Sequence, residues 1–125
     1  METSHLPSYE NCQKLKEIWF PQEGYYWYET ESKTIDDKKG MEWQNRACEW
    51  LEWVYAPSVM EMIDIMPMED IIITNEECTF ENWCDFVITF RWDWFTYEEK
   101  NEDLPNALAE MIIWLHENNF ISFNK

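Results

Sequence analysis

Apolar residues recur three or four positions apart in three stretches of the chain, the spacing that places them on one face of a helix. Helices are therefore predicted over three ranges: 8–20, 58–66 and 104–118. Ser58, followed three residues later by Glu61, has the capping-box pattern that begins a helix. Pro105 suits the first turn of the last helix, and Asn118–Asn119 is expected to end it.

Alternating or β-branched residues between these helices predict short strands. The strands are expected at four places: Tyr25–Tyr28, Ile71–Thr74, Trp83–Trp92 and Trp94–Tyr97. A bend or hairpin at Asp93 separates the last two. In the longest strand, Phe86, Ile88 and Phe90 share a face that should pack against the last helix. The helix residues expected to meet this face form one stripe: Leu108, Met111, Ile112 and Leu115.

Two segments have weaker patterns. The run Asp36–Gly40 (DDKKG) indicates a turn or loop. Residues 42–55 fit a helix, because apolar side chains recur at helical spacing from Trp43, and also a strand near Trp53, where apolar residues alternate. We favour the helix.

Helices at both ends with short strands between them predict an α+β fold. We expect one domain over residues 1–125, with a small, mostly antiparallel sheet of three or four strands covered by N-terminal, central and C-terminal helices.

The charge balance restricts the partners of this domain. Twenty-six acidic against nine basic residues leave a net charge of −17, and the pI is about 4.2. Nucleic acid and anionic lipid repel a chain with this much negative charge. We therefore expect no direct nucleic-acid binding and no membrane association. Its expected partner is a protein or ribonucleoprotein with a basic nucleic-acid channel. Alternatively, the acidity only keeps an aromatic-rich chain in solution.

No residue pattern points to catalysis, a metal or a cofactor. With two Gly residues the chain has no phosphate-binding loop, and no nucleophile signature occurs. Cys78 and Cys84 are the nearest pair of the four cysteines, and their spacing matches no zinc motif. The first residues lack a signal-peptide pattern. We therefore expect no enzyme, no metal, no cofactor and no disulfide, in a reducing cytoplasm.

The candidate binding residues lie in and beside the densest acidic run, Tyr97–Asp103 (YEEKNED). They are four carboxylates and one nearby aromatic residue: Glu98, Glu99, Glu102, Asp103 and Trp94. Carboxylates in such a run imitate the phosphates of a nucleic acid and so suit an Arg- or Lys-lined channel. Asp103 also suits the N-cap of the last helix, and a solvated loop is the alternative interpretation of the run.

The tryptophans divide into two groups by their place in the patterns. Four lie on or near apolar stripes and are expected in the core: Trp43, Trp50, Trp92 and Trp114. Three lie off those faces and are candidates for partner contact, because exposed Trp is a favoured interface anchor: Trp53, Trp83 and Trp94.

Three segments together resemble a group of small phage and prophage proteins. The matching segments are Ser8–Gln22 (SYENCQKLKEIWFPQ), Ala56–Pro67 (APSVMEMIDIMP) and Leu104–Ile121 (LPNALAEMIIWLHENNFI). That group has a Lys-Leu-Lys then Phe-Pro-Gln motif, a Pro-Ser or Pro-Thr capped helix and an Ala-rich closing helix. Where it has a small residue and Gly before Phe-Pro-Gln, this chain has Ile18–Trp19, so the first helix is expected to end differently.

The resemblance implies a phage setting and transfers no functional residue. In that setting the location is the cytoplasm of a bacterial host cell, and the partner with the basic channel is a host protein or ribonucleoprotein. Small acidic phage proteins without an enzymatic site often inhibit host defence, including anti-CRISPR proteins that bind RNA-guided nucleases. We therefore expect an anti-CRISPR-like counter-defence protein that binds and inhibits a basic nucleic-acid-handling host effector. Two alternatives remain open: a phage accessory or structural protein acting through protein contacts, and a DNA-mimic inhibitor of restriction or repair enzymes.

Overall fold

The computed structural model describes residues 6–48, 51–75, 86–93, 95–101 and 103–123. Their elements follow one another as α1 (Tyr9–Glu17), β1 (Tyr26–Glu29), β2 (Ile35–Asp37), α2 (Lys38–Ala47), β3 (Trp53–Ala56), α3 (Val59–Ile65), the 3₁₀ helix η1 (Met68–Asp70), β4 (Ile71–Asn75), β5 (Phe86–Trp92), β6 (Phe95–Asn101) and α4 (Leu104–Glu117). This arrangement confirms the α+β class, and the capping box of Ser58 and Glu61 is formed as expected.

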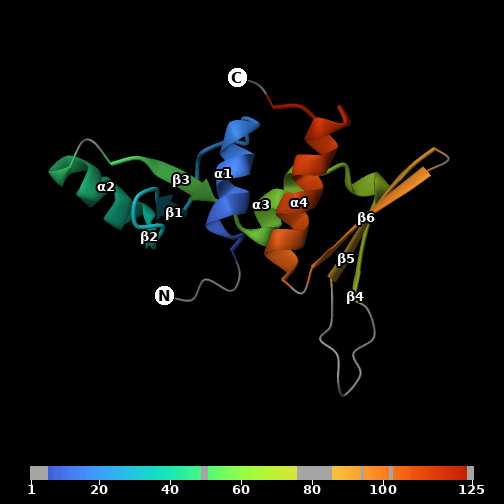
Figure 1. Cartoon of the computed structure of the whole chain (residues 1–125), viewed down its shortest axis with the longest axis horizontal. Helices are drawn as coiled ribbons and strands as arrows, with labels where there is room; N and C mark the ends of the chain where they lie inside the picture. Colours follow the sequence, from blue (N-terminus) through green and yellow to red (C-terminus); the bar gives the residue numbers. More distant parts are fainter. Residues whose placement is uncertain (1–5, 49–50, 76–85, 94, 102, 124–125) are drawn as a thin grey trace, which may run out of the picture.

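The described strands form two antiparallel sheets, where the sequence predicted a single small sheet. Sheet A has the strand order β2-β1-β3, and sheet B has the order β4-β5-β6. The two sheets lie toward opposite ends of the molecule, with α1, α3 and α4 between them (Figure 1). Asp93 has a φ of 54° in the tight connection between β5 and β6, at the predicted hairpin.

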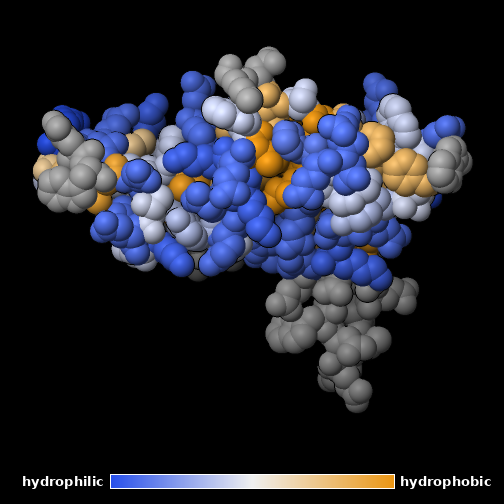
Figure 2. All heavy atoms as spheres, turned by 45° about the horizontal axis from the view of Figure 1, so that its top comes forward, coloured by the Kyte–Doolittle hydropathy of each residue, from blue (hydrophilic) through white to orange (hydrophobic). Residues whose placement is uncertain are grey.

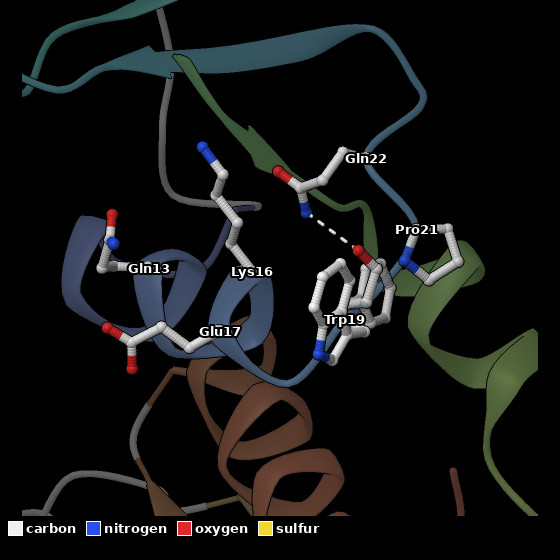
Figure 3. Close-up of a pocket in the computed structure, with 7 residues that line it drawn as sticks. Gln13, Lys16, Glu17, Trp19, Pro21 and Gln22 are labelled. Carbon is white, nitrogen blue, oxygen red and sulfur yellow. Dashed lines mark hydrogen bonds between the residues drawn. The ribbon is translucent and has the colours of Figure 1, made fainter. Parts of the chain in front are cut away.

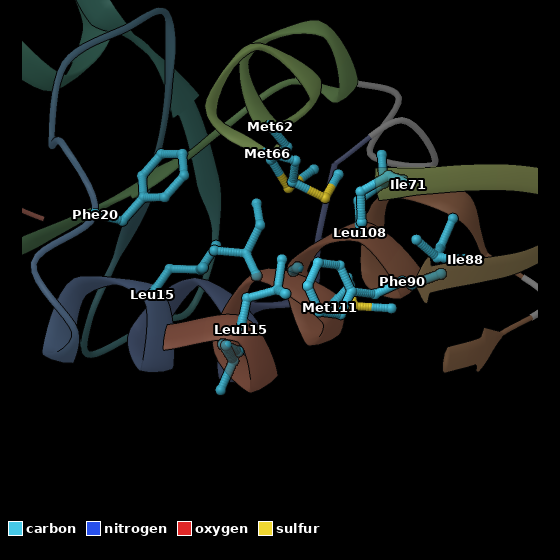
Figure 4. Close-up of a cluster of buried hydrophobic side chains, with 14 of the residues drawn as sticks. Leu15, Phe20, Met62, Met66, Ile71, Ile88, Phe90, Leu108, Met111 and Leu115 are labelled. Atoms are coloured by element: carbon cyan, nitrogen blue, oxygen red, sulfur yellow. The ribbon is translucent and has the colours of Figure 1, made fainter. Parts of the chain in front are cut away.

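The main core forms where α4 meets sheet B. Figure 4 shows α4 contributing Leu108, Met111 and Leu115 to a cluster with Ile88 and Phe90 of β5. All of these side chains and that of Ile112 are fully buried, and Phe86 packs partly buried against them. The predicted packing of the last helix on this strand face is confirmed.

The segment predicted as a turn at Asp36–Gly40 is instead the end of β2 and the beginning of α2. Asp37 caps the helix, because its Oδ1 accepts a 2.8 Å hydrogen bond from the backbone N–H of Gly40. A Cβ on Gly40 would meet the Asp36 carboxylate, so a larger residue there would require that side chain to shift. The DDKKG run is therefore a helix start, which resembles a turn in composition.

Residues 42–55 contain both of the structures that their pattern allowed. The helix favoured by the sequence ends at Ala47, and Trp53–Ala56 forms β3, so a single helix over the whole range was wrong. All four residues of β3 are buried, which explains why the strand itself is a continuous run of apolar and aromatic residues.

The first helix ends with a left-handed residue although that residue is tryptophan. Trp19 has a φ of 73°, and its N–H bonds to the carbonyl of Lys16. The N–H of Phe20 bonds to the carbonyl of Leu15, which completes a Schellman-type ending. The expectation that Ile18–Trp19 would end the helix differently was therefore wrong: Trp19 takes the place that glycine usually holds.

Hydrophilic residues cover most of the face drawn in Figure 2, and hydrophobic residues gather in its middle with smaller patches toward both ends. Within the described ranges, no helix is long and apolar enough to cross a membrane.

Candidate acidic binding groove

The acidic run chosen from the sequence is mostly strand and not a solvated loop. Tyr97–Asn101 belongs to β6, whose residues alternate between partly buried and exposed positions. Glu98 is exposed and lies opposite Thr89 of β5, whereas the half-buried Glu99 lies opposite Ile88 of the core face. The two glutamates therefore point to opposite faces of sheet B. Trp94 and Glu102 lie outside the described residues.

Asp103 serves the start of α4. Its Oδ2 accepts a 2.9 Å hydrogen bond from the side-chain amide of Asn106, and its Oδ1 is buried with no hydrogen-bond partner. Burial raises the pKa of this carboxyl. Asp103 occupies the N-cap position of α4 as predicted, but its side chain makes no capping hydrogen bond.

A pocket of about 300 Å³ gathers three carboxylates beside Glu99's face of sheet B. Its lining comes from α1, β6 and α4: Asn11, Lys14, Tyr97, Glu99, Glu110, Ile113, Trp114 and Glu117. We call this pocket the acidic groove. Its carboxylates are Glu99, Glu110 and Glu117, and the one cation of its lining is Lys14.

Two stacked aromatic rings form a wall of the acidic groove. The rings of Tyr97 and Trp114 have centroids 3.8 Å apart and planes inclined by 7°. The Tyr97 hydroxyl donates a hydrogen bond to Oε1 of Glu99. Burial, followed by this bond and the nearby carboxylates, raises the pKa of Tyr97, so the phenol stays protonated and remains a donor at neutral pH.

Burial and a neighbouring carboxylate oppose the ionisation of Glu110 in the groove. Burial raises the pKa of Glu110, and the charge of Glu99 raises it further. A 3.3 Å hydrogen bond from the side-chain amide of Asn101 acts in the opposite direction. A cation in the groove would relieve this repulsion, so the site favours a positively charged group.

Sequence reasoning missed two of the groove's carboxylates. Glu110 and Glu117 lie seven residues apart on α4 with Trp114 four residues after the first, so all three project from one face of the helix. This i, i+4, i+7 spacing was visible in the sequence. The run Glu98–Asp103 has more carboxylates per residue and was therefore favoured as the binding site. The density of carboxylates along the chain, however, does not show which face of the molecule each one occupies.

The tryptophans lie largely opposite to expectation. Trp43 is 67% exposed and Trp92 is 48% exposed, so the prediction that they belong to the core was wrong. Trp53, predicted as a contact residue, is buried, and its indole N–H donates to Asn45. Trp114 is partly buried against the core, as predicted. The remaining candidates, Trp50 and Trp83, lie outside the described residues.

A second pocket, of about 510 Å³, lies at the end of α1 around Trp19 (Figure 3). Two of its polar side chains bond to the outer edge of β3: Lys16 donates to the carbonyl of Trp53, and Gln22 accepts from the N–H of Tyr55. Gln22 also donates to the carbonyl of Phe20. These polar groups complete the fold, so this pocket offers less chemistry to a ligand than the acidic groove.

The described residues show no group of three or more His, Cys, Asp or Glu side chains placed to hold a metal ion. Burial raises the pKa of Cys12 to about 12, so its thiol is protonated at neutral pH and unsuited to nucleophilic attack. Cys78 and Cys84 lie outside the described part of the chain.

Comparison of the chain with protein-family models, curated proteins and solved structures finds no match. The function must therefore be inferred from the acidic groove and from the charge of the chain.

Proposed function

We propose that this chain is an anti-CRISPR-like counter-defence protein that binds and inhibits a basic, nucleic-acid-handling host effector in the bacterial cytoplasm. The observation that supports this function is the convergence of Glu99, Glu110 and Glu117 on one pocket with an aromatic wall. The net charge of −17 adds long-range attraction to a basic surface. Binding in the channel of the effector blocks access of its nucleic acid.

The acidic groove is suited to an arginine side chain of the effector. A guanidinium is planar, donates several hydrogen bonds to carboxylates and packs against aromatic rings. Glu110 and Glu117 supply the acceptors from α4, and Glu99 supplies one from β6. Burial and the charge of Glu99 raise the pKa of Glu110, and a cation bound beside this carboxylate offsets both effects and so contributes to affinity.

The test uses two neighbouring residues of β6 as a matched pair. Glu99→Lys reverses a charge inside the groove, and Glu98→Lys makes the same change on the opposite face of the strand. Binding to an oligo-arginine peptide is measured by calorimetry, and inhibition by DNA cleavage with a purified RNA-guided nuclease. Glu99→Lys should weaken peptide binding about tenfold or more, because it leaves a desolvated charge pair unmade. Glu98→Lys should have a much smaller effect.

Equal effects of the two variants would show that only net charge matters and would exclude the groove as the site. Glu117→Lys provides a second variant at an exposed position of the groove, in case Glu99→Lys disturbs the fold. Failure of the wild-type chain to inhibit any basic effector while it still binds oligo-arginine would remove the inhibitory function and keep the cation site.

A second function, a phage accessory protein that acts through protein contacts, is favoured by a different observation. Helix α2 has no buried residue, and its Trp43 is the most exposed large apolar residue among those described. Surfaces of this kind are typical of assembly contacts.

A further inference from the structure

Helix α2 lacks the packing that usually stabilises a short helix. Its ten residues include none that is buried. An isolated helix of this length is marginally stable in water, so packing on one face normally holds it. Here two polar bonds attach it to sheet A: Gln44 donates to Asp36 at 2.8 Å, and Asn45 accepts from Trp53 at 2.8 Å. The helix lies at one end of the molecule (Figure 1).

The opposite face of α2 combines cations with an exposed tryptophan. Lys39, Trp43 and Arg46 follow i, i+4, i+7 spacing and are all exposed. We call them the cationic stripe. The helix has three cations and one carboxylate, Glu42, in a chain whose acidic residues outnumber its basic ones by 26 to 9. A negatively charged surface is therefore the complement of this helix.

The acidic groove contains a stripe with the same spacing and opposite charge. Glu110, Trp114 and Glu117 also follow i, i+4, i+7 spacing, on α4, and we call them the acidic stripe. In each helix the two charged positions are separated by a rise of about 10 Å, because a residue advances a helix by about 1.5 Å. Two charges on one stripe can therefore meet two charges on the other at the same time, with the tryptophans between them.

We propose that the cationic stripe of one copy of this chain packs against the acidic stripe of a second copy. Copies repel one another over most of their surface because each has a charge of −17. The contact between these two stripes brings opposite charges and an exposed indole together. Arg and Trp are the residues that contribute most to protein interfaces, and the stripe places both on one helix face. This contact covers α2 and fills the groove, so self-association competes with binding of the effector.

Charge reversal tests the contact better than salt, because salt screens both the attraction between the stripes and the repulsion between whole molecules. Sedimentation velocity at fixed ionic strength should show concentration-dependent association of the wild type. Lys39→Glu with Arg46→Glu should abolish it. Glu110→Lys with Glu117→Lys should abolish it too, although this pair makes the chain less negative and so weakens the general repulsion between copies. Mixing the two double variants should restore association, since each supplies the stripe that complements the other.

Matched controls keep the charge and move it elsewhere. Lys38→Glu with Arg91→Glu changes the net charge as the cationic-stripe variant does, at exposed positions outside the stripe, and should still associate. Circular dichroism and thermal unfolding establish that each variant is folded. If Glu110→Lys prevents folding, Glu117→Lys alone replaces the pair, because that residue is exposed.

The inference uses the proposed groove but stands apart from its function. A wild-type chain that is monomeric at all concentrations overturns it, and so does association that neither reversal affects or that mixing does not restore. Oligo-arginine binding by a monomeric chain would leave the proposed function in place. If the cationic stripe binds oligo-thymidylate and the chain does not self-associate, the proposal is overturned. The partner of the stripe would then be single-stranded nucleic acid and not a second copy.

Discussion

The ring of Trp114 in α4 stacks on the ring of Tyr97 in β6, with 3.8 Å between their centroids. The stack joins the C-terminal helix to the outer strand of sheet B and holds the wall of the acidic groove in place. The hydroxyl of Tyr97 donates a hydrogen bond to Glu99 and so holds this carboxylate beside the wall. The position of a candidate binding carboxylate therefore depends on an aromatic contact.

A double-mutant cycle measures this contact. Tyr97→Leu and Trp114→Leu should each destabilise the chain, and the double variant should lose less than the sum, because the stacking is lost only once. The expected coupling is about 0.5–1.5 kcal/mol, the range for aromatic pairs. Chemical denaturation of the four proteins provides the free energies of unfolding. Strictly additive losses would mean that the two rings stabilise the fold independently.

Ile112 tests the packing of α4 on sheet B. The residue is fully buried in the main cluster, so Ile112→Ala should reduce the free energy of unfolding by about 2–5 kcal/mol through lost burial and a cavity. Met60→Ala is the control, because Met60 is 65% exposed on α3 and its loss should cost no more than about 0.5 kcal/mol. A loss below about 1 kcal/mol for Ile112→Ala would contradict its place in the core.

Glu110 should make stability depend on pH. Because its pKa is raised in the folded chain, the folded state keeps this proton at pH values where the unfolded state has lost it. Stability therefore falls as pH rises through that window, and ionised Glu110 is destabilising at neutral pH. Glu110→Gln should raise Tm at neutral pH. At pH values below the ordinary pKa range of a glutamate, where Glu110 is protonated in both states, it should not raise Tm. Its oxygen still accepts the bond from Asn101.

Thermal unfolding of wild type and Glu110→Gln across acid and neutral pH checks this prediction. Glu98→Gln is the control, since Glu98 is exposed on the other face of β6. An advantage of Glu110→Gln that is the same at every pH would show that charge is not its cause.

Trp19 tests the left-handed ending of α1. A non-glycine residue at a φ of 73° is strained, so Trp19→Gly should be more stable than Trp19→Ala by about 1–2 kcal/mol. Neither variant keeps the indole, so the comparison isolates the backbone. At the exposed Lys14 within α1 the order should reverse, with Ala more stable than Gly by about 1 kcal/mol. Chemical denaturation of the four variants decides, and equal stabilities at position 19 would show no strain there.

Most of the helices could be predicted from the sequence, because the patterns that indicate them lie within a few neighbouring residues. Ser58 and Glu61 form their capping box within one turn, and the apolar stripe of α4 is contained in a single helix. The hairpin at Asp93 also needs only neighbouring residues. Each of these depends on contacts that the sequence places close together.

The rest depended on partners distant in sequence. Tyr26 pairs with Ala56 in sheet A, and no local pattern specifies that register. Helix α2 is attached through Gln44 and Asn45, so its inner face is polar and its tryptophan is exposed. A search for apolar stripes therefore predicts that the wrong face of this helix points toward the core. In the same way, the acidic groove joins Glu99 to two carboxylates of α4 that no continuous run contains.

Among the described strands, β3 is the last of sheet A on one side. Lys16 donates to the carbonyl of Trp53 as a neighbouring peptide N–H would, and Gln22 accepts from the N–H of Tyr55 as a neighbouring carbonyl would. An unpaired strand edge is a template on which other chains aggregate. Two side chains here occupy the hydrogen-bonding groups that such growth requires, so this edge is protected from amyloid-like pairing even though all four of its residues are buried and apolar or aromatic.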